Sequence, residues 1–162
     1  EEELGSLAHR LAAAPTLVHR DFQSQNVMLR GGEPVLIDFQ GMRVGNPLYD
    51  VGSLLYDPYV AMTEADRMVL LARYHALSGM KLSWPDLQEA FREASAQRLM
   101  QALGAYGFLG LKKGRPAFLG HCASGIRNLA EATREAGRLP VLHALALECR
   151  EAVREGPYAD SP

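Results

Sequence analysis

Three oxygen-bearing side chains follow short apolar runs near the start of the sequence. Asp21 and Asn26 come after the apolar pair at 17–18, with Asn26 five positions beyond Asp21, and Asp38 directly follows the run at 35–37. Short apolar runs bounded by polar residues are typical of buried strands, so we expect these side chains at strand ends. Carboxylate and amide oxygens are hard ligands of the kind that Mg²⁺ binds together with phosphates. The pattern therefore indicates a magnesium and phosphate site.

A small β-region must position these residues. The apolar run at 27–29 is joined to the run at 35–37 through Gly31-Gly32-Glu33-Pro34, which is a strong hairpin signal. We therefore expect three short strands. The loop from Gly41 to Pro47 contains two glycines and one proline, so we expect a shaped turn there rather than a strand.

The rest of the chain predicts helices. Apolar residues recur at helical spacing, and Thr63 with Asp66 resembles a capping box. In the last helix we expect buried side chains at Leu142, Leu145, Cys149 and Val153. The expected helices cover residues 2–13, 49–56, from Thr63 to Gly79, from Ser83 to about Leu111, from Leu119 to near Gly137, and onward from Pro140. The fold class is therefore mostly α with a small β-hairpin region (α+β), over residues 1–156, with a tail at 157–162.

The composition is that of one ordinary globular domain. The chain has 162 residues, of which 48% are hydrophobic and 22% charged. A formal net charge of −2 gives no electrostatic reason to expect nucleic acid or an anionic membrane as a partner. No apolar run approaches membrane-spanning length and the start is acidic, unlike a signal peptide, so we expect a cytoplasmic protein. Cys122 and Cys149 are expected to be inert, buried thiols rather than a disulfide or a zinc site.

Four motifs carry a resemblance to a known family. The motifs are HRDFQSQN, IDFQ, GNPLYD and SLLYDPYV. They resemble the aminoglycoside phosphotransferase family, whose fold is protein-kinase-like. Within that family they resemble the bacterial anomeric kinases that phosphorylate N-acetylmuramate and N-acetylglucosamine. Protein kinases share the HRDxxxxN loop and a DFG triplet. Here Gln40 stands where they carry glycine, and only about ten residues separate Asp38 from Tyr49. That segment is too short for peptide docking, so the resemblance favours a small-molecule kinase.

The resemblance implies roles for individual residues. In a kinase that uses ATP and Mg²⁺, Asp21 would accept the proton of the substrate hydroxyl or orient it. Asn26 and Asp38, the latter in the metal motif 38–40, would hold Mg²⁺ against the nucleotide phosphates. Asp50 would be a buried carboxylate that accepts hydrogen bonds from the backbone of the catalytic loop 19–26. We expect His19 to pin this loop rather than to shuttle protons.

The resemblance also implies that only part of a kinase is present. The chain matches a C-terminal lobe with a helical body at 49–154, and no glycine-rich phosphate loop, VAIK-like lysine strand or partner-glutamate helix precedes the catalytic loop. We expect this C-lobe fragment to be inactive alone, and its partner to be a separate N-lobe chain or another copy of itself.

The charge of the second half bears on the acceptor. Residues 81–162 contain 11 Lys and Arg against 9 Asp and Glu, a net charge of 11 − 9 = +2. A polycationic aminoglycoside calls for an acidic pocket, so a neutral or anionic sugar fits better. The basic run at Lys112, Lys113 and Arg115 either meets a substrate carboxylate or faces water, and Trp84 either stacks on a sugar ring or packs at a helix start.

Three alternatives stay open. The first is a related kinase that acts on aminoglycosides or choline. The second is a non-catalytic fragment that binds sugar or only dimerises through bare apolar surface. The third and weakest is a metal-dependent hydrolase that uses Asp21 and Asp38, which a two-metal site would normally surround with more ligands.

Overall fold

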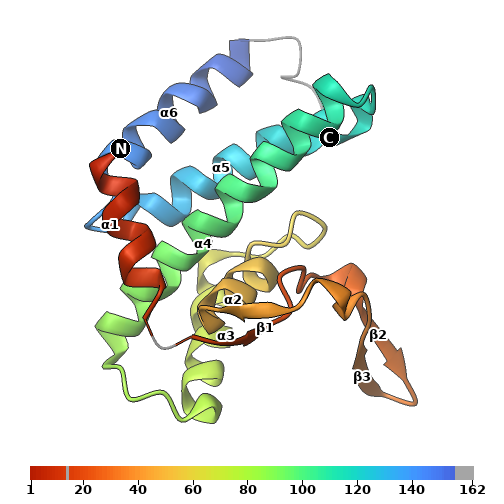
Figure 1. The fold of residues 1–162 in the computed structure, drawn as a ribbon, viewed down its shortest axis with the longest axis vertical. Coiled ribbons are helices and arrows are strands. Elements are labelled where there is room, and N and C mark those ends of the chain that lie inside the picture. Colours follow the sequence, from red (N-terminus) through yellow and green to blue (C-terminus); the bar gives the residue numbers. More distant parts are fainter. Residues whose placement is uncertain (14, 156–162) are drawn as a thin grey trace.

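The structure is a computed structural model that describes residues 1–13 and 15–155 (Figure 1). Helices form most of the molecule, and four short strands lie together on one side of it. The helices are α1 (Glu2–Leu11), α2 (Pro47–Leu55), α3 (Glu64–Ser78), α4 (Trp84–Gly107), α5 (Cys122–Arg134) and α6 (Pro140–Glu155), and the strands are β1 (Thr16–Val18), β2 (Val27–Arg30), β3 (Glu33–Leu36) and β4 (Arg43–Gly45). The predicted α+β class is confirmed, and the predicted tail at 157–162 lies outside the described residues.

The predicted hairpin is present. Strands β2 and β3 pair antiparallel, with Val27 opposite Leu36 and Arg30 opposite Glu33. Gly31 and Gly32 form the two-residue turn, and both have positive φ, at 60° and 88°. Tight hairpin turns of this length require positive φ at both positions, which glycine adopts without strain.

The prediction of a turn from Gly41 to Pro47 was wrong. Residues 43–45 form β4, which pairs antiparallel with β1. The catalytic loop and the hairpin lie between these two strands in the sequence. Gly45 suits this pairing, because a Cβ at that position would lie 3.0 Å from a methyl carbon of Val18. Pro47 begins α2, where its missing N–H is not needed. Gly45 and Pro47 therefore mark the end of β4, and their presence does not prevent a strand from forming.

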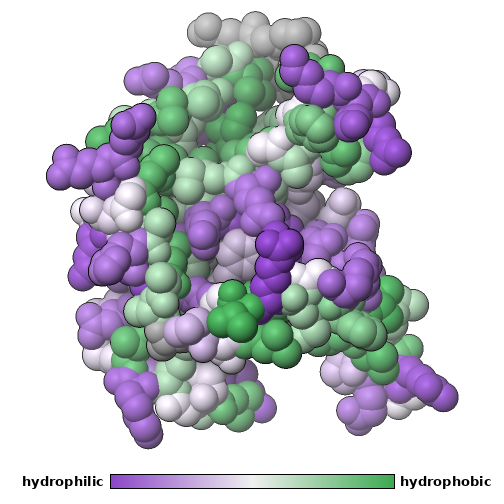
Figure 2. All heavy atoms as spheres, in the orientation of Figure 1, coloured by the Kyte–Doolittle hydropathy of each residue, from purple (hydrophilic) through white to green (hydrophobic). Residues whose placement is uncertain are grey.

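The prediction that the strands are buried was also wrong. Of the apolar residues on β1, only Val18 is buried, and nine apolar side chains on or beside the strands are between 39% and 76% exposed. Figure 2 shows apolar side chains at the surface in the lower part of this view, where Figure 1 places the strands. Each sheet has only two strands, so little covers their outer side. We call this surface the strand face: Leu17, Met28, Leu29, Val35, Leu36, Ile37, Phe39, Met42 and Val44.

The hydrophobic core lies around α4. This helix packs mainly against α2 and α5, and Phe91 in its first half is fully buried and stacks on Tyr56 with ring centroids 5.9 Å apart. Gly52 of α2 allows the closest approach, because a Cβ there would lie 2.6 Å from Oγ and 2.9 Å from Cα of Ser95. Helix α2 is therefore fixed against α4, which matters because α2 carries Asp50.

The helix boundaries follow local signals. Thr63 and Asp66 form the predicted capping box of α3, and Ser83 caps α4. The fourth helix continues beyond Gly107 as one π-helical turn, η3 (Phe108–Lys112), and a 3₁₀ segment, η4 (Pro116–His121), leads into α5. Among the described residues, no helix combines the length and apolar composition that a membrane span requires.

Some burial predictions need correction. In α6, Leu142 is buried, whereas Leu145 is 52% exposed because it lies on the side turned away from the core. Cys149 and Val153 are half-buried, as is Cys122 in α5, so neither cysteine is the fully buried thiol that the sequence predicts. Partial burial still raises the pKa of the Cys122 thiol, through loss of hydration of the thiolate.

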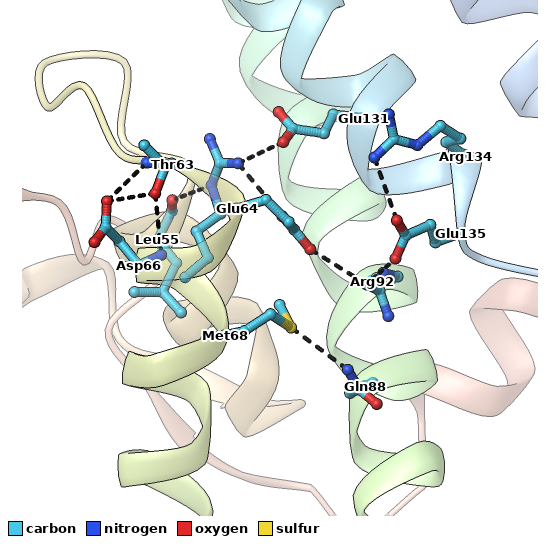
Figure 3. A network of polar contacts seen from close by, with 11 residues as sticks. Leu55, Thr63, Glu64, Asp66, Met68, Gln88, Arg92, Glu131, Arg134 and Glu135 are labelled. Carbon is cyan, nitrogen blue, oxygen red and sulfur yellow. Dashed lines mark hydrogen bonds and ion pairs between the residues drawn. The ribbon is translucent and has the colours of Figure 1, made fainter.

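A polar network ties α3 to its neighbours (Figure 3). The buried guanidinium of Arg67 donates to the backbone oxygen of Leu55 at 2.9 Å and to Glu131 at 2.8 Å, and it lies 4.3 Å over the ring of Tyr56. Glu64 pairs with Arg92 of α4, which also pairs with Glu135. The network holds the end of α2 in place, since Arg67 caps a free carbonyl there.

Candidate active site

The loop of residues 19–26 is held by a carboxylate in the first turn of α2. The half-buried Asp50 accepts a hydrogen bond on Oδ2 from the backbone nitrogen of His19 at 2.6 Å, and one on Oδ1 from that of Arg20 at 2.8 Å. These are the hydrogen bonds that the resemblance implies for this residue, but the carboxylate is half-buried rather than buried. Bonds from N–H groups to an ionised carboxylate are stronger than neutral ones, so the pair fixes the start of the loop.

A second carboxylate, Asp57, holds the other end of the loop. It is only 4% exposed, and it accepts hydrogen bonds from the backbone nitrogens of Ser24 and Tyr59. Sequence reasoning missed this residue. Its only local signal is an aspartate followed by Pro58 after a predicted helix, which is common in ordinary turns.

His19 links the catalytic loop to the strand that precedes Asp38. Its buried ring donates from Nε2 to the backbone oxygen of Ile37 at 2.9 Å, since a carbonyl can only accept. The proton therefore sits on Nε2, and within the described chain the buried Nδ1 has no hydrogen-bond partner. The geometry is that of a structural tie between the two motifs.

Asn26 and Asp38 lie at neighbouring strand ends. The backbone oxygen of Asn26 accepts from the nitrogen of Ile37 at 3.0 Å, which extends the β2–β3 ladder to the residue before Asp38. The buried amide of Asn26 donates from Nδ2 to the backbone oxygen of Asp21 at 2.8 Å. Among the described residues its Oδ1 takes no hydrogen bond, and Asp38 uses only Oδ1, which accepts from Gln40.

This donor set fits a magnesium ion. One amide oxygen and one carboxylate oxygen are free, both are hard donors, and Mg²⁺ usually takes only one or two protein ligands, with phosphates and water completing its shell. The described residues contain no cluster of three or more His, Cys, Asp or Glu side chains that could hold a metal by themselves. A site shared with a phosphate-bearing ligand is therefore the type that these residues suit.

Two residues of the site have a left-handed backbone. Arg20 has a φ of 74° and Asp38 a φ of 62°. Non-glycine residues in this region carry strain of about 1 kcal/mol or more, and such strain is found preferentially at functional sites. The hydrogen bond from the Arg20 nitrogen to Asp50 holds the first of these conformations in place.

A cleft of about 430 Å³ opens in front of the catalytic loop. The predicted residues His19, Asp21 and Asp38 line it, and Gln23 and Gln40 lie beside them. Asn26 is not among its lining residues, and Asp50 lines a separate apolar pocket. The structure therefore brings the two acidic groups of the predicted chemistry to one cavity, with the other predicted residues supporting them.

An arginine that sequence reasoning missed also lines this cleft. Arg98, from the middle of α4, lies with Nη2 3.3 Å from Oδ1 of Asp21 and donates from Nε to Oγ of Ser53 at 3.0 Å. No local signal could have found it, because 77 positions separate Arg98 from Asp21.

Aromatic side chains also line the cleft. Tyr59, Tyr106 and Phe118 line the cleft, and the Tyr106 ring lies 6.5 Å from that of Phe118 and 5.4 Å from that of His121. Burial is the main cause that raises the pKa of the Tyr106 hydroxyl, so the group stays neutral. Flat, partly apolar rings that carry a polar tip are suited to bind a sugar ring.

Comparison with known families assigns the chain to a family. The model of the Phosphotransferase enzyme family matches residues 1–90, which include the catalytic loop, the hairpin, α2 and α3. The chain belongs to this family.

Three curated members are similar over most of the chain. N-acetylmuramate/N-acetylglucosamine kinase of Neisseria meningitidis serogroup B is 27% identical over 91% of this chain and 46% of its own length. The protein of the same name from Pseudomonas aeruginosa is 30% identical over 79% of this chain and 39% of its own, and that from Pseudomonas putida is 29% identical over 68% and 34%. The chain spans less than half the length of these relatives.

The other substrate-site candidates lie elsewhere. Lys112, Lys113 and Arg115 are exposed and do not line the cleft, and Lys113 lies 5.5 Å over the ring of Phe108. Trp84 packs beside His75 at the start of α4, with ring centroids 6.1 Å apart. The cations that line the cleft are Arg20 and Arg98, and the basic loop is not among its lining residues.

Proposed function

We propose that this chain is the C-terminal lobe of an ATP- and Mg²⁺-dependent kinase that phosphorylates the anomeric hydroxyl of an amino sugar. The observation that carries the proposal is that Asp21, on the loop anchored by Asp50, and Asp38, after strand β3, line one cleft in a member of a phosphotransferase family. Phosphoryl transfer depends on positioning and electrostatics more than on covalent chemistry by the protein. A fixed loop that carries one acid, with the second acid at a strand end beside the same cavity, meets that need.

Asp21 is the proposed base. Its carboxylate is half-exposed to the cleft, so a substrate hydroxyl can approach it, and Arg98 holds one of its two oxygens. The other oxygen would accept the hydroxyl proton as the sugar oxygen attacks the terminal phosphate. Asn26 fixes the backbone oxygen of Asp21 and so limits the movement of the loop.

Asn26 and Asp38 are the proposed metal ligands. A bound Mg²⁺ would supply charge neutralisation on the nucleotide phosphates. Gln40 holds Oδ1 of Asp38, which leaves Oδ2 to face the ion. His19 keeps the strand end that carries Asp38 in register with the catalytic loop.

The charge of the cleft supports a sugar that is not cationic. Its acidic lining consists of Asp21 and Asp38, which the reaction itself would use, and Arg20 and Arg98 balance them. A polycationic aminoglycoside would need further carboxylates, and the described residues bring none to this cleft. The names of the curated relatives agree with an amino sugar such as N-acetylmuramate or N-acetylglucosamine.

The strand face supports the proposal that more protein covers this side. Nine exposed apolar side chains lie on or beside the four strands, one of which precedes Asp38, and exposed apolar surface usually marks an interface. We propose that an N-terminal lobe covers it, either in a longer protein or in a separate chain, and that the fragment alone is inactive. Self-association through the same face is the alternative. A cytoplasmic location, where ATP is available, is part of this proposal.

The test is ³¹P NMR of the full-length protein with ATP, Mg²⁺ and separate acceptors: N-acetylmuramate, N-acetylglucosamine, kanamycin and choline. We expect a new anomeric sugar-phosphate signal with the amino sugars, and Asp21→Asn should reduce the rate by about 10²- to 10⁴-fold, the usual contribution of a general base. The matched control is Asp66→Asn, which changes the same side chain in the exposed capping box of α3.

Each outcome decides between the candidates. Transfer to kanamycin or choline would keep the kinase mechanism and overturn the charge argument. Release of inorganic phosphate without transfer to any acceptor would favour the hydrolase alternative. Near-normal turnover of Asp21→Asn would remove Asp21 as the base.

A further inference from the structure

Arg98 reaches the reacting carboxylate from a distant part of the chain. It lies in α4, and its Nη2 is 3.3 Å from Oδ1 of Asp21. The Arg98 side chain is 15% exposed, whereas that of Asp21 is 48% exposed. Arg98 is thus the less exposed partner of the pair, and Asp21 is the one that is more open to the cleft.

The guanidinium is itself held on two further sides. Its Nε donates to the hydroxyl of the buried Ser53 at 3.0 Å, and its Cζ lies 6.0 Å from the centre of the Tyr49 ring. Tyr49 is in turn bonded through its hydroxyl to Gln101, one turn further along α4. A planar guanidinium can satisfy two partners along different edges, which a lysine ammonium on a flexible stem cannot do in the same geometry.

No other described side chain donates a hydrogen bond to the Asp21 carboxylate. The remaining bonds of this residue involve its backbone oxygen, which accepts from Asn26 and from the backbone nitrogen of Gln23. The backbone of Asp21 is therefore fixed by the loop, and the rotation of its carboxyl group is restrained by Arg98.

We propose that Arg98 is the positioning residue of the Asp21 carboxylate, holding Oδ1 so that Oδ2 faces the acceptor hydroxyl. The inference rests on the proposed kinase function, and it adds a residue that the catalytic-loop motif does not contain. Reaction rates fall steeply when a reacting group moves by about 1 Å, by about 10²-fold in enzymes. Loss of Arg98 should therefore reduce kcat and leave nucleotide binding unchanged.

The kinetic test uses the full-length protein with Arg98→Ala, Arg98→Lys and the control Arg127→Ala. Arg127 is an exposed arginine of α5 that forms no ion pair among the described residues. We expect Arg98→Ala to lower kcat by about 10- to 100-fold with the KM for ATP within about twofold. Arg98→Lys should recover little, and added guanidinium ion at a non-denaturing concentration should partly restore Arg98→Ala. Arg127→Ala should match the wild type.

A second measurement does not depend on turnover. The ¹⁵N–¹H signals of the arginine side chains should include one immobilised guanidinium that disappears in Arg98→Ala. Its Nε–H shift should change in Ser53→Ala, and its terminal N–H signals should change in Asp21→Asn.

These results separate the two proposals. Three results would overturn the positioning role while the kinase function stands. They are a normal kcat in Arg98→Ala, a loss of kcat that guanidinium does not restore, and an Arg98 signal that does not change in Asp21→Asn. A wild-type protein that transfers phosphate to no acceptor would overturn the proposed function, and the positioning role with it. The side-chain signals would then show only whether the Arg98–Asp21 contact exists.

Discussion

Oδ2 of Asp50 lies 2.6 Å from the backbone nitrogen of His19, and this contact joins α2 to the start of the catalytic loop. Oδ1 makes the corresponding bond to the nitrogen of Arg20, whose backbone is left-handed. One carboxylate therefore sets both the position and the unusual conformation of the residues next to Asp21.

Asp50→Asn should destabilise the protein and disorder the loop. An amide offers only one acceptor oxygen, so one of the two backbone N–H groups would face an NH₂ group. Leaving a buried donor unsatisfied costs about 1–3 kcal/mol, and we expect a loss of that size in the free energy of unfolding measured with urea. Glu148→Gln is the control, because Glu148 is exposed on α6. Equal stability of the two variants would contradict this role of Asp50.

Local signals predicted much of this fold. The β2–β3 hairpin, the capping box of α3 and the cap of α4 depend on residues within a few positions of one another. The bonds that Asp50 accepts were also predicted, but only through the resemblance of the motifs, since 31 positions separate Asp50 from His19.

The missed features are all non-local. Strand β4 exists because it pairs with β1, and its own composition indicates a turn. Arg98 reaches the cleft only after α4 has packed on α2, so no spacing in the sequence announces it. The exposure of the strand face was mispredicted for a related reason. An apolar run indicates side chains that need to be covered, but it does not show whether the covering residues lie within these 162 residues.

Gly52→Ala should disturb both stability and the site. The new methyl group would overlap Ser95 of α4, whose Cα would lie only 2.9 Å away, so the two helices would have to separate. Overpacking of this kind costs about 1–3 kcal/mol. Because α2 carries Asp50 and α4 carries Arg98, we also expect turnover of the full-length protein to fall.

Gly104→Ala provides the matched control. This residue also lies in a helix, but a Cβ there meets nothing within 4 Å. The substitution should stabilise α4 by about 0.5–1 kcal/mol, because alanine loses less backbone entropy than glycine. Thermal unfolding of both variants measures the difference, and a destabilised Gly104→Ala would contradict the packing described for α4.

The capping box of α3 should make stability depend on pH. The pKa of Asp66 is lowered, first by the hydrogen bond from the Thr63 hydroxyl and then by that from its backbone nitrogen. A carboxyl whose pKa is lower in the folded state stabilises the fold above its unfolded pKa of about 4, and this contribution is lost as pH falls through the folded value.

Thr63→Val tests this contribution because it removes the hydroxyl and keeps the shape of the side chain. Urea midpoints at pH 6.5 and pH 3 should differ more in the wild type than in Thr63→Val, and Asp66→Asn should show the smallest difference of the three. Identical pH dependence in all three proteins would mean that the capping box makes no contribution to the pH dependence of stability.

The aromatic wall of the cleft gives the most direct test of the acceptor. Phe118 and Tyr106 line the same cavity as Asp21, with ring centroids 6.5 Å apart, and a sugar bound against these rings would place an apolar face on them. We expect Phe118→Ala to raise the KM for the amino sugar about tenfold, equivalent to about 1.4 kcal/mol, with the KM for ATP unchanged. Phe108→Ala is the control, because Phe108 is exposed on η3 and does not line the cleft. An unchanged KM for the sugar in Phe118→Ala would place the acceptor elsewhere in the cleft, whereas a rise in the KM for ATP would make this wall part of the nucleotide site.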